Sequence, residues 1–275
     1  MYGAWERQAP PGSGRQGFAE PEFYSKHEPL ERLHFITFDD EAISHAQLAD
    51  EACRGGVRLV QLRTKGKEYA EWLQIAREVK TVCDKYRAQL IINDNVFVAK
   101  ALGAYGVHLG REDLSVSEAR QVLGAGFVIG GTAHNRAEVL ALIEAGVDYI
   151  GVGPFRETST KKVLSPVLGL SGISELLKAA QALEGRVTQS QIGISGGPTS
   201  QSAKRGQAGF GRELSRTELA PPVPIIAIGG IEESDVLLLI ETGVYGVAVS
   251  AAIGRAASIH DSAARFVKSL EESIL

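Results

Sequence analysis

The sequence predicts a (β/α)8 barrel, a closed ring of parallel strands in which each strand is followed by a helix. From residue 33 onward, short apolar and often β-branched runs alternate with amphipathic helical patterns. The strand runs are apolar on both faces, as in parallel sheets that helices cover. Eight such units can be traced along the chain, which favours a closed barrel over an open doubly wound sheet.

The first four units follow one another without interruption. Their strands are predicted at 33–38, 57–62, 89–92 and 107–109, and their helices at 41–55, 69–86, 96–102 and 115–123. In the first helix, Ile43, Ala46 and Leu48 recur at helical spacing, and glycines end it. Ser115 and Glu118 have the spacing of a capping box, which predicts the start of the fourth helix.

The second four units are predicted with a break before the seventh strand. Their strands start at 127–129, 149–152, 224–230 and 246–250, and their helices span 136–145, 171–183, 234–242 and 257–275. Residues 185–222 are rich in Gly, Ser, Gln and Arg, which predicts a mobile insertion at the barrel end away from the strand carboxyl ends. Residues 1–29 lack a sustained period and are interpreted as a flexible arm, so residues 30–275 form a single domain.

Composition narrows the class of protein. The formal net charge is −4 and the pI about 5.9, so no overall basic field exists to bind nucleic acid or an anionic membrane. The two cysteines, Cys53 and Cys83, fall in helical patterns and are expected as free thiols in a reducing compartment. The sequence contains neither an apolar run of roughly 20 residues nor a signal pattern. We therefore expect a cytoplasmic protein, and a homodimer stays open.

Polar side chains gather where the second, third and fourth strands end. A barrel brings such strand ends to one face, which we call the mouth. Acids, cations, an amide and an imidazole are expected to meet there, namely Arg63, Lys65, Asn93, Asp94, His108 and Asp113. This mixture indicates a metal ion with a phosphorylated ligand.

Asp94 and Asp113 follow neighbouring strands, so their carboxylates could bind one Mg²⁺, which prefers oxygen ligands. The alternative is that each caps the helix that follows it. Arg63 and Lys65 alternate along the end of the second strand and should face the same side. Beside two carboxylates, such a pair suits a pyrophosphate bridged by Mg²⁺, although basic residues at strand ends are more often solvated.

Small residues follow the last two strands, where barrels commonly bind phosphate through backbone N–H groups. Gly229 and Gly230 follow the seventh strand, and Ser250 and Ala251 follow the eighth. The alternative is a tight turn that needs positive φ. The segment after the sixth strand, 158–162, adds hydroxyls and ammonium groups, but it could be an ordinary loop.

Two histidines have a structural alternative. His108 lies within the fourth strand and could face inward, where the default role is that of a hydrogen-bonded core residue. His134 follows the fifth strand, where its structural role is to cap the next helix.

Taken together, these residues resemble the thiamine phosphate synthase family, within a wider group that includes the thiazole tautomerases. The resemblance covers about 33–253, apart from the insertion. Its motifs are Gln61-Leu62-Arg63-x-Lys65, Ile92-Asn93-Asp94, Gly106-Val107-His108-Leu109-Gly110-x-x-Asp113, Gly153-Pro154 with Thr158-x-Thr160-Lys161, and Ala227-Ile228-Gly229-Gly230-Ile231.

The resemblance implies a reaction and a role for each residue. The reaction joins hydroxymethylpyrimidine diphosphate to thiazole phosphate and releases pyrophosphate, by Mg²⁺-assisted dissociative substitution. Mg²⁺ would be held by Asp94 and Asp113, and the pyrophosphate by Arg63, Lys65, Asn93 and Lys161. The pyrimidine would contact Gln61 and His108, while Thr132 stands where the family usually has Ser. The thiazole phosphate would contact Thr158, Thr160, Gly229, Gly230, Ser250 and Ala251. Arg63, Lys161 and Thr132 are the implied catalytic residues.

The chain departs from the family pattern at two further places. Residues 155–157 replace an aromatic-Pro step, and Ser250 precedes the usual position of the last turn's serine, which Ala251 occupies. Two alternatives stay open. One is a thiazole tautomerase-like enzyme on the same barrel, against which the paired acids argue. The other is a non-catalytic sensor of a phosphorylated ligand.

Overall fold

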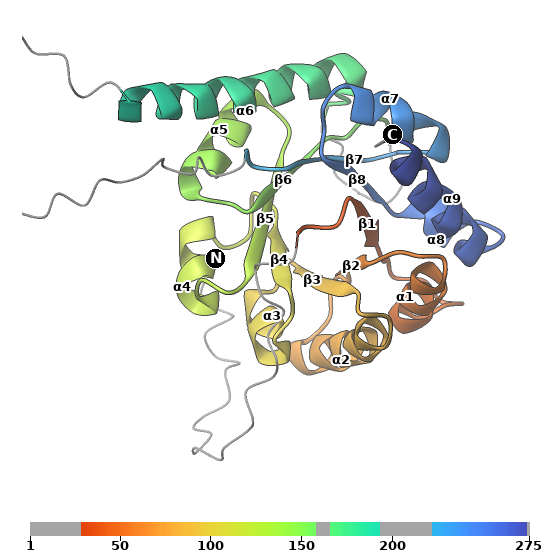
Figure 1. Cartoon of the computed structure of the whole chain (residues 1–275). Coiled ribbons are helices and arrows are strands. Elements are labelled where there is room, and N and C mark those ends of the chain that lie inside the picture. Colours follow the sequence, from red (N-terminus) through yellow and green to blue (C-terminus); the bar gives the residue numbers. More distant parts are fainter. Residues whose placement is uncertain (1–28, 158–165, 193–221, 274–275) are drawn as a thin grey trace, which may run out of the picture.

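A closed barrel of parallel strands forms the centre of the protein (Figure 1). The computed structural model describes residues 29–157, 166–192 and 222–273. The strands are β1 (Leu33–Ile36), β2 (Leu59–Leu62), β3 (Gln89–Asn93), β4 (Gly106–Leu109), β5 (Val128–Ala133), β6 (Tyr149–Val152), β7 (Ile225–Ile228) and β8 (Gly246–Val249). Each strand pairs with the next, and β8 pairs with β1. The predicted fold class is therefore confirmed.

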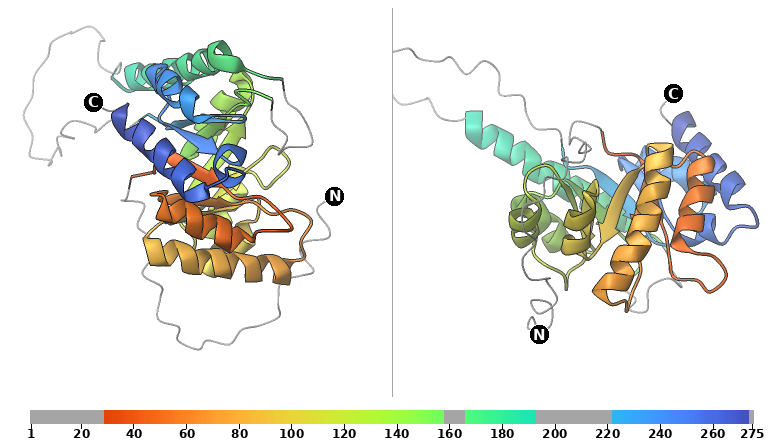
Figure 2. Two further views of the ribbon diagram at one scale, coloured as in Figure 1. Left: turned by 90° about the vertical axis from the view of Figure 1, so that its right-hand side faces the viewer. Right: turned by 90° about the horizontal axis from the view of Figure 1, so that it is seen from below.

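Helices surround the ring of strands (Figure 1). They are α1 (His45–Arg54), α2 (Tyr69–Tyr86), α3 (Val96–Leu102), α4 (Val116–Leu123), α5 (Arg136–Ala145), α6 (Gly169–Ile192), the 3-10 turn η2 (Glu233–Asp235), α7 (Val236–Glu241), α8 (Ala251–Gly254) and α9 (Ile259–Glu272). The last helix, α9, packs against α1, so the outer layer also closes (Figure 2). Within the described ranges, no helix has the length and apolar character needed to span a membrane.

The hydrophobic core has an outer and an inner part, separated by the strands. Side chains of a strand alternate between its two faces, so neighbours in sequence enter different parts. In β2, for example, Val60 packs into the layer beneath the helices, while Leu59 packs inside the barrel. The inner cluster includes Tyr149, and a Cβ on Gly130 of the adjacent strand would lie 2.1 Å from the tyrosine ring. Gly130 is thus required for Tyr149 to fit.

Several helix boundaries differ from the predicted ones. The first helix begins at His45, four residues later than predicted, because Ser44 caps it in a capping box with Gln47. The segment predicted as one closing helix, 257–275, contains α9 alone, with the short α8 before it. The capping box at Ser115 and Glu118 is confirmed.

The helix predicted to end near Leu183 continues through Ile192. Residues 185–192, assigned to the insertion from their composition, are therefore helical. The remainder of the insertion, 193–221, and the arm, 1–28, lie outside the described residues, so their character stays a prediction.

Candidate active site

The carboxylates of Asp94 and Asp113 lie side by side at the ends of β3 and β4. The backbone N–H of Asp94 donates to the carbonyl of His108 over 2.8 Å, which continues the strand pairing by one residue. One oxygen of Asp113, Oδ2, accepts a hydrogen bond from the Gly110 N–H at 2.6 Å. Burial, followed by the charge and a hydrogen bond of Asp113, raises the pKa of Asp94 to about 7. The strand ends therefore bring the two acids together.

Neither carboxylate caps the helix that follows it. The side chain of Asn95 accepts from the Val98 N–H at 3.0 Å and caps α3. Ser115 caps α4 through the Glu118 N–H. The capping alternative considered for the two acids is thus wrong, because a residue one or two positions further along performs that role in each case.

The backbone of Asp94 is also unusual. Its φ is 63°, in the left-handed region that residues with a Cβ seldom adopt, although Asp and Asn tolerate it best. Such residues cluster at functional sites, where the surrounding structure holds the unfavourable conformation. A strained residue with a strongly raised pKa is a candidate for a functional role on two independent grounds.

Arg63 and Lys65 lie near this acidic pair. Their positive charges both act to lower the pKa of Asp94, against the larger effects of burial and Asp113. The strand β2 ends at Leu62, so both residues lie in the loop after it. The second strand was predicted to end at Leu62, as it does, and the charges of both cations act on Asp94, as expected for side chains on the same side. Hydrogen bonds to Thr37 and Asp39, in the segment after β1, take the place of strand pairing for this loop.

His108 belongs to a hydrogen-bonded network inside the barrel. Its Nδ1 lies 2.9 Å from the hydroxyl of Tyr149, and its Nε2 lies 2.7 Å from the hydroxyl of Thr132. Gln61 also hydrogen-bonds Tyr149, whose hydroxyl pKa is raised by burial. His108 thus faces inward and has partners on both nitrogens, as its structural alternative requires. The neighbouring Asn93 is buried beside it in register.

The Gly229–Gly230 turn has the positive φ values of the tight-turn alternative, 91° and 66°. A Cβ on Gly229 would lie 2.6 Å from the Cβ of Pro154, so this backbone passes close to the segment after β6. After β8, Ser250 precedes α8, and its side chain makes no capping hydrogen bond to that helix. Phosphate binding at either turn stays a prediction.

The segment that replaces the family's aromatic-Pro step is anchored by Arg156. Its guanidinium pairs with both carboxylate oxygens of the buried Asp235 and donates to the Gly230 carbonyl at 3.3 Å. It also lies over the Phe155 ring, 4.8 Å from its centre. The backbone N–H of Arg156 donates to the Gly229 carbonyl at 2.9 Å. An ion pair thus fixes this segment against the turn after β7.

The structural alternative for His134 predicted that it caps α5, and this prediction is wrong. The side chain of Asn135 accepts from the Glu138 N–H at 3.0 Å and caps the helix. The imidazole of His134 instead contacts the carbonyl of Gly153 through Nδ1. This contact joins the ends of β5 and β6.

The paired carboxylates fit a hard divalent cation. In the described ranges, no group of three or more His, Cys, Asp or Glu side chains is arranged to hold a metal. Mg²⁺ does not need such a group, because one or two carboxylates bind it while water and substrate phosphates complete its shell. Burial and the adjacent charge of Asp113 raise the pKa of Asp94, and a bound cation would favour its ionised form.

Comparison with known proteins decides the family. A family model described as thiamine monophosphate synthase matches residues 33–196. The chain belongs to this family. A thiamine-phosphate synthase of Bacteroides fragilis is 39% identical over 221 residues, which cover 80% of this chain and 91% of that protein. One of Flavobacterium johnsoniae is 36% identical over 222 residues, 81% of this chain and 88% of the relative.

A solved structure agrees with the fold. The thiamine phosphate pyrophosphorylase from Pyrococcus furiosus superposes with a TM-score of 0.66 at 24% identity, covering 89% of this chain and 98% of that one. The resemblance inferred from the sequence motifs is confirmed, and the chain is a member of an enzyme family of the transferase class.

Three residues that the thiamine monophosphate synthase motifs single out, Thr158, Thr160 and Lys161, lie outside the described residues. Tyr149, by contrast, was missed by the sequence reasoning. The signal for it was the pairing of a large aromatic residue in β6 with a glycine-rich strand, Gly130-Gly131, in β5.

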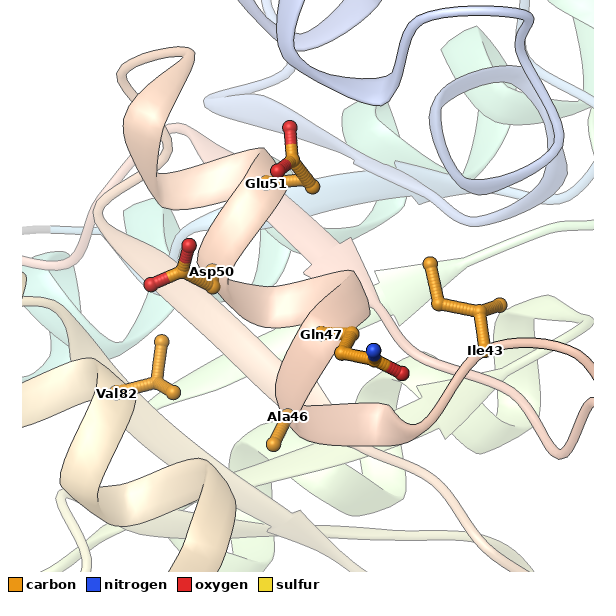
Figure 3. Close-up of a pocket in the computed structure, with 6 residues that line it drawn as sticks. All are labelled: Ile43, Ala46, Gln47, Asp50, Glu51 and Val82. Carbon is orange, nitrogen blue, oxygen red and sulfur yellow. The ribbon is translucent and has the colours of Figure 1, made fainter.

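A surface pocket lies apart from the mouth (Figure 3). It has a volume of about 450 Å³ and is lined from α1, its preceding loop and α2 by Ile43, Ala46, Gln47, Asp50, Glu51 and Val82. Because it lies between two helices of the outer layer, it is separated from the barrel interior by the strands.

Removing the Tyr149 hydroxyl tests the interior network. We expect Tyr149→Phe to lower the free energy of unfolding by about 1–3 kcal/mol, since it removes the buried hydroxyl that hydrogen-bonds His108 and Gln61. Urea denaturation measures this. The matched control is Tyr86→Phe, whose hydroxyl contacts Asp50 near the surface and whose loss should cost less than about 0.5 kcal/mol. Equal losses in both variants would contradict the network's role.

Proposed function

We propose that this chain is a thiamine-phosphate synthase that joins hydroxymethylpyrimidine diphosphate to thiazole phosphate and releases pyrophosphate. The observation that carries the proposal is the pair of carboxylates at the mouth, Asp94 and Asp113, with the charges of Arg63 and Lys65 beside it. The family supports the same activity. We expect small molecules rather than nucleic acid as partners, and a cytoplasmic location.

In this proposal Asp94 and Asp113 hold Mg²⁺. When bound, the ion would neutralise part of the charge of the diphosphate and of the departing pyrophosphate. The raised pKa of Asp94 supports this role, because two acids this close favour a shared cation at neutral pH. The cations of Arg63 and Lys65 add positive charge on the side of β2.

The basic side chains are proposed to stabilise the leaving group. As the bond between the pyrimidine methylene carbon and the diphosphate oxygen breaks, its electron pair departs with the pyrophosphate. Arg63, Lys65 and Lys161 would balance this developing charge, and the Asn93 amide would donate a further hydrogen bond. The pyrimidine-methyl cation that remains is attacked by the lone pair of the thiazole nitrogen, which forms the new carbon–nitrogen bond.

The remaining residues are proposed to hold the two rings in place. Gln61 and His108 would contact the pyrimidine, and the Thr132 hydroxyl would orient His108 through the hydrogen bond between them. The thiazole phosphate would be held by Gly229, Gly230, Ser250 and Ala251, together with Thr158 and Thr160. Positioning the nitrogen within a few Å of the reacting carbon supplies much of the acceleration, so little general-base catalysis is needed.

Incubating the protein with both phosphorylated halves, with and without Mg²⁺, tests the activity. We expect mass spectrometry to detect the joined product only when Mg²⁺ and both halves are present. A tautomerase would need neither the diphosphate nor the metal, so proton exchange on a thiazole phosphate without joined product would favour that alternative. Binding of a half without turnover would favour a sensor. Either result would overturn the proposed activity.

A further inference from the structure

A carboxylate in the loop after β1, Asp39, holds the loop that carries Arg63 and Lys65. The hydroxyl of Thr64 donates to Asp39 Oδ1 at 2.6 Å, and the backbone N–H of Lys65 donates to Asp39 Oδ2 at 3.1 Å. Thr64, the donor, is buried with 1% of its surface exposed, while the Asp39 side chain is 47% exposed. Both carboxylate oxygens of Asp39 thus accept hydrogen bonds, one from each of two consecutive residues of the loop.

A second anchor lies beside Asp39, at the end of β1. The hydroxyl of Thr37 accepts from the Arg63 backbone N–H at 3.3 Å, and the Thr37 N–H donates to the Gln61 carbonyl at 3.0 Å. The first residue of α1, His45, bridges the two anchors. Its Nδ1 lies 2.8 Å from the Thr37 hydroxyl and its Nε2 lies 3.2 Å from Asp39 Oδ1.

The hydrogen bonds of His45 to Thr37 and Asp39 can both form when His45 is neutral and Asp39 is charged. Burial lowers the pKa of His45, although Asp39 acts in the opposite direction. Burial also acts to raise the pKa of Asp39, but hydrogen bonds from Thr64 and His45 outweigh it and lower that pKa. In this state Nε2–H of His45 donates to Asp39, and Nδ1 accepts from Thr37. The nearby charge of Lys67 acts on both groups and favours the same state.

These contacts hold a loop that strand pairing does not. The strand β2 ends at Leu62, and Lys65 is exposed. The direction of its long side chain is therefore set by the position of its backbone. We propose that Asp39, oriented by His45, is a positioning residue that sets Arg63 and Lys65 toward the diphosphate. This role rests on the proposed function, and in it Asp39 acts through Arg63 and Lys65.

Asp39→Asn with Asp40→Asn as its matched control tests the proposal. Both carboxylates are exposed and each change removes one negative charge from the same loop, but Asp40 accepts from the Ala42 N–H within that loop, whereas Asp39 accepts from Thr64 and Lys65. In Asp39→Asn, we expect KM for the pyrimidine diphosphate to rise about tenfold, the factor that about 1.4 kcal/mol gives. KM for thiazole phosphate should stay within about twofold, and Asp40→Asn should change neither constant.

A second pair of variants covers the case in which Asp39→Asn does not fold. Thr64→Val removes the hydroxyl that Asp39 accepts from, and Thr64→Ser restores it. We expect Thr64→Val to raise the same KM and Thr64→Ser to return it near the wild-type value, with melting temperatures recorded for all variants. A role in folding alone would not separate the two substrates.

The outcomes are distinct. A rise in both KM values together, equal effects of the two Asp variants, or no rise in Thr64→Val would overturn the positioning role while the proposed function stands. A wild-type protein that forms no joined product would instead overturn the proposed function, and the positioning role with it.

Discussion

Asp94→Asn is expected to abolish Mg²⁺-dependent product formation while making the metal-free protein more stable. The substitution keeps the size of the side chain and suits its φ of 63°, because Asn tolerates the left-handed region as well as Asp does. It removes the charge that Mg²⁺ requires, so we expect kcat/KM to fall by at least about 10²–10³. Steady-state assays over a range of Mg²⁺ concentrations measure the loss.

The gain in stability follows from the raised pKa of Asp94, about 7 in the folded protein against an ordinary 3.8. Below pH 3.8 the residue is protonated in both states. Between 3.8 and about 7 the unfolded chain ionises while the folded protein keeps the proton, so the stability of the metal-free protein falls as pH rises through this window. Asn does not ionise, so the Asp94→Asn variant does not lose stability in this way as pH rises. Melting temperatures without Mg²⁺ should therefore be higher for Asp94→Asn at pH 8, and the difference should shrink toward pH 4.

Glu112→Gln is the control for Asp94→Asn, since it removes an exposed negative charge next to Asp113. It should leave both turnover and the pH dependence of melting unchanged. Turnover of Asp94→Asn at the wild-type level would count heavily against the metal site. A Mg²⁺-dependent rise in melting temperature that survives the substitution would do the same.

The barrel and the meeting of its strand ends follow from the sequence because they rest on regular patterns. Strands apolar on both faces and separated by amphipathic helices have few ways to bury their surface. Once the barrel closes, Asp94 and Asp113 must lie on neighbouring strand ends whatever the details of their side chains. That is why their proximity was predictable, as was the capping box of Ser115 with Glu118, while the capping of α3 by Asn95 rather than by Asp94 needed the structure.

The parts that sequence reasoning missed depend on side-chain partners far apart in the chain. Asp39 looks like an ordinary loop acid until Thr64, 25 residues away, donates to it. Arg156 looks like a disruption of a family motif until Asp235, 79 residues away, pairs with it. The length of α6 was missed for another reason, since the polar composition of residues 185–192 resembles a loop although helical geometry tolerates it.

Lys161→Ala is expected to reduce kcat by about 10²–10³, the usual cost of removing one donor that stabilises developing charge. The residue lies outside the described part of the chain, so the expectation rests on its place in the Thr158-x-Thr160-Lys161 motif. Since the pyrophosphate gains charge only as it departs, an ammonium group aimed at it acts most strongly in the transition state. We therefore expect kcat and kcat/KM to fall together, with KM little changed.

The adjacent lysine provides the matched control, because Lys162→Ala removes the same charge one residue further along. If the motif assigns the role correctly, Lys162→Ala should keep turnover within about threefold of wild type, which is less than about 0.7 kcal/mol. Similar losses in both variants would mean that the segment contributes only a general positive field. A loss confined to Lys162→Ala would assign the role to Lys162 instead of Lys161. It would also shift by one residue the part of the segment that contacts the diphosphate. Single-turnover measurements separate these outcomes from a change in product release, because they report the chemical step directly.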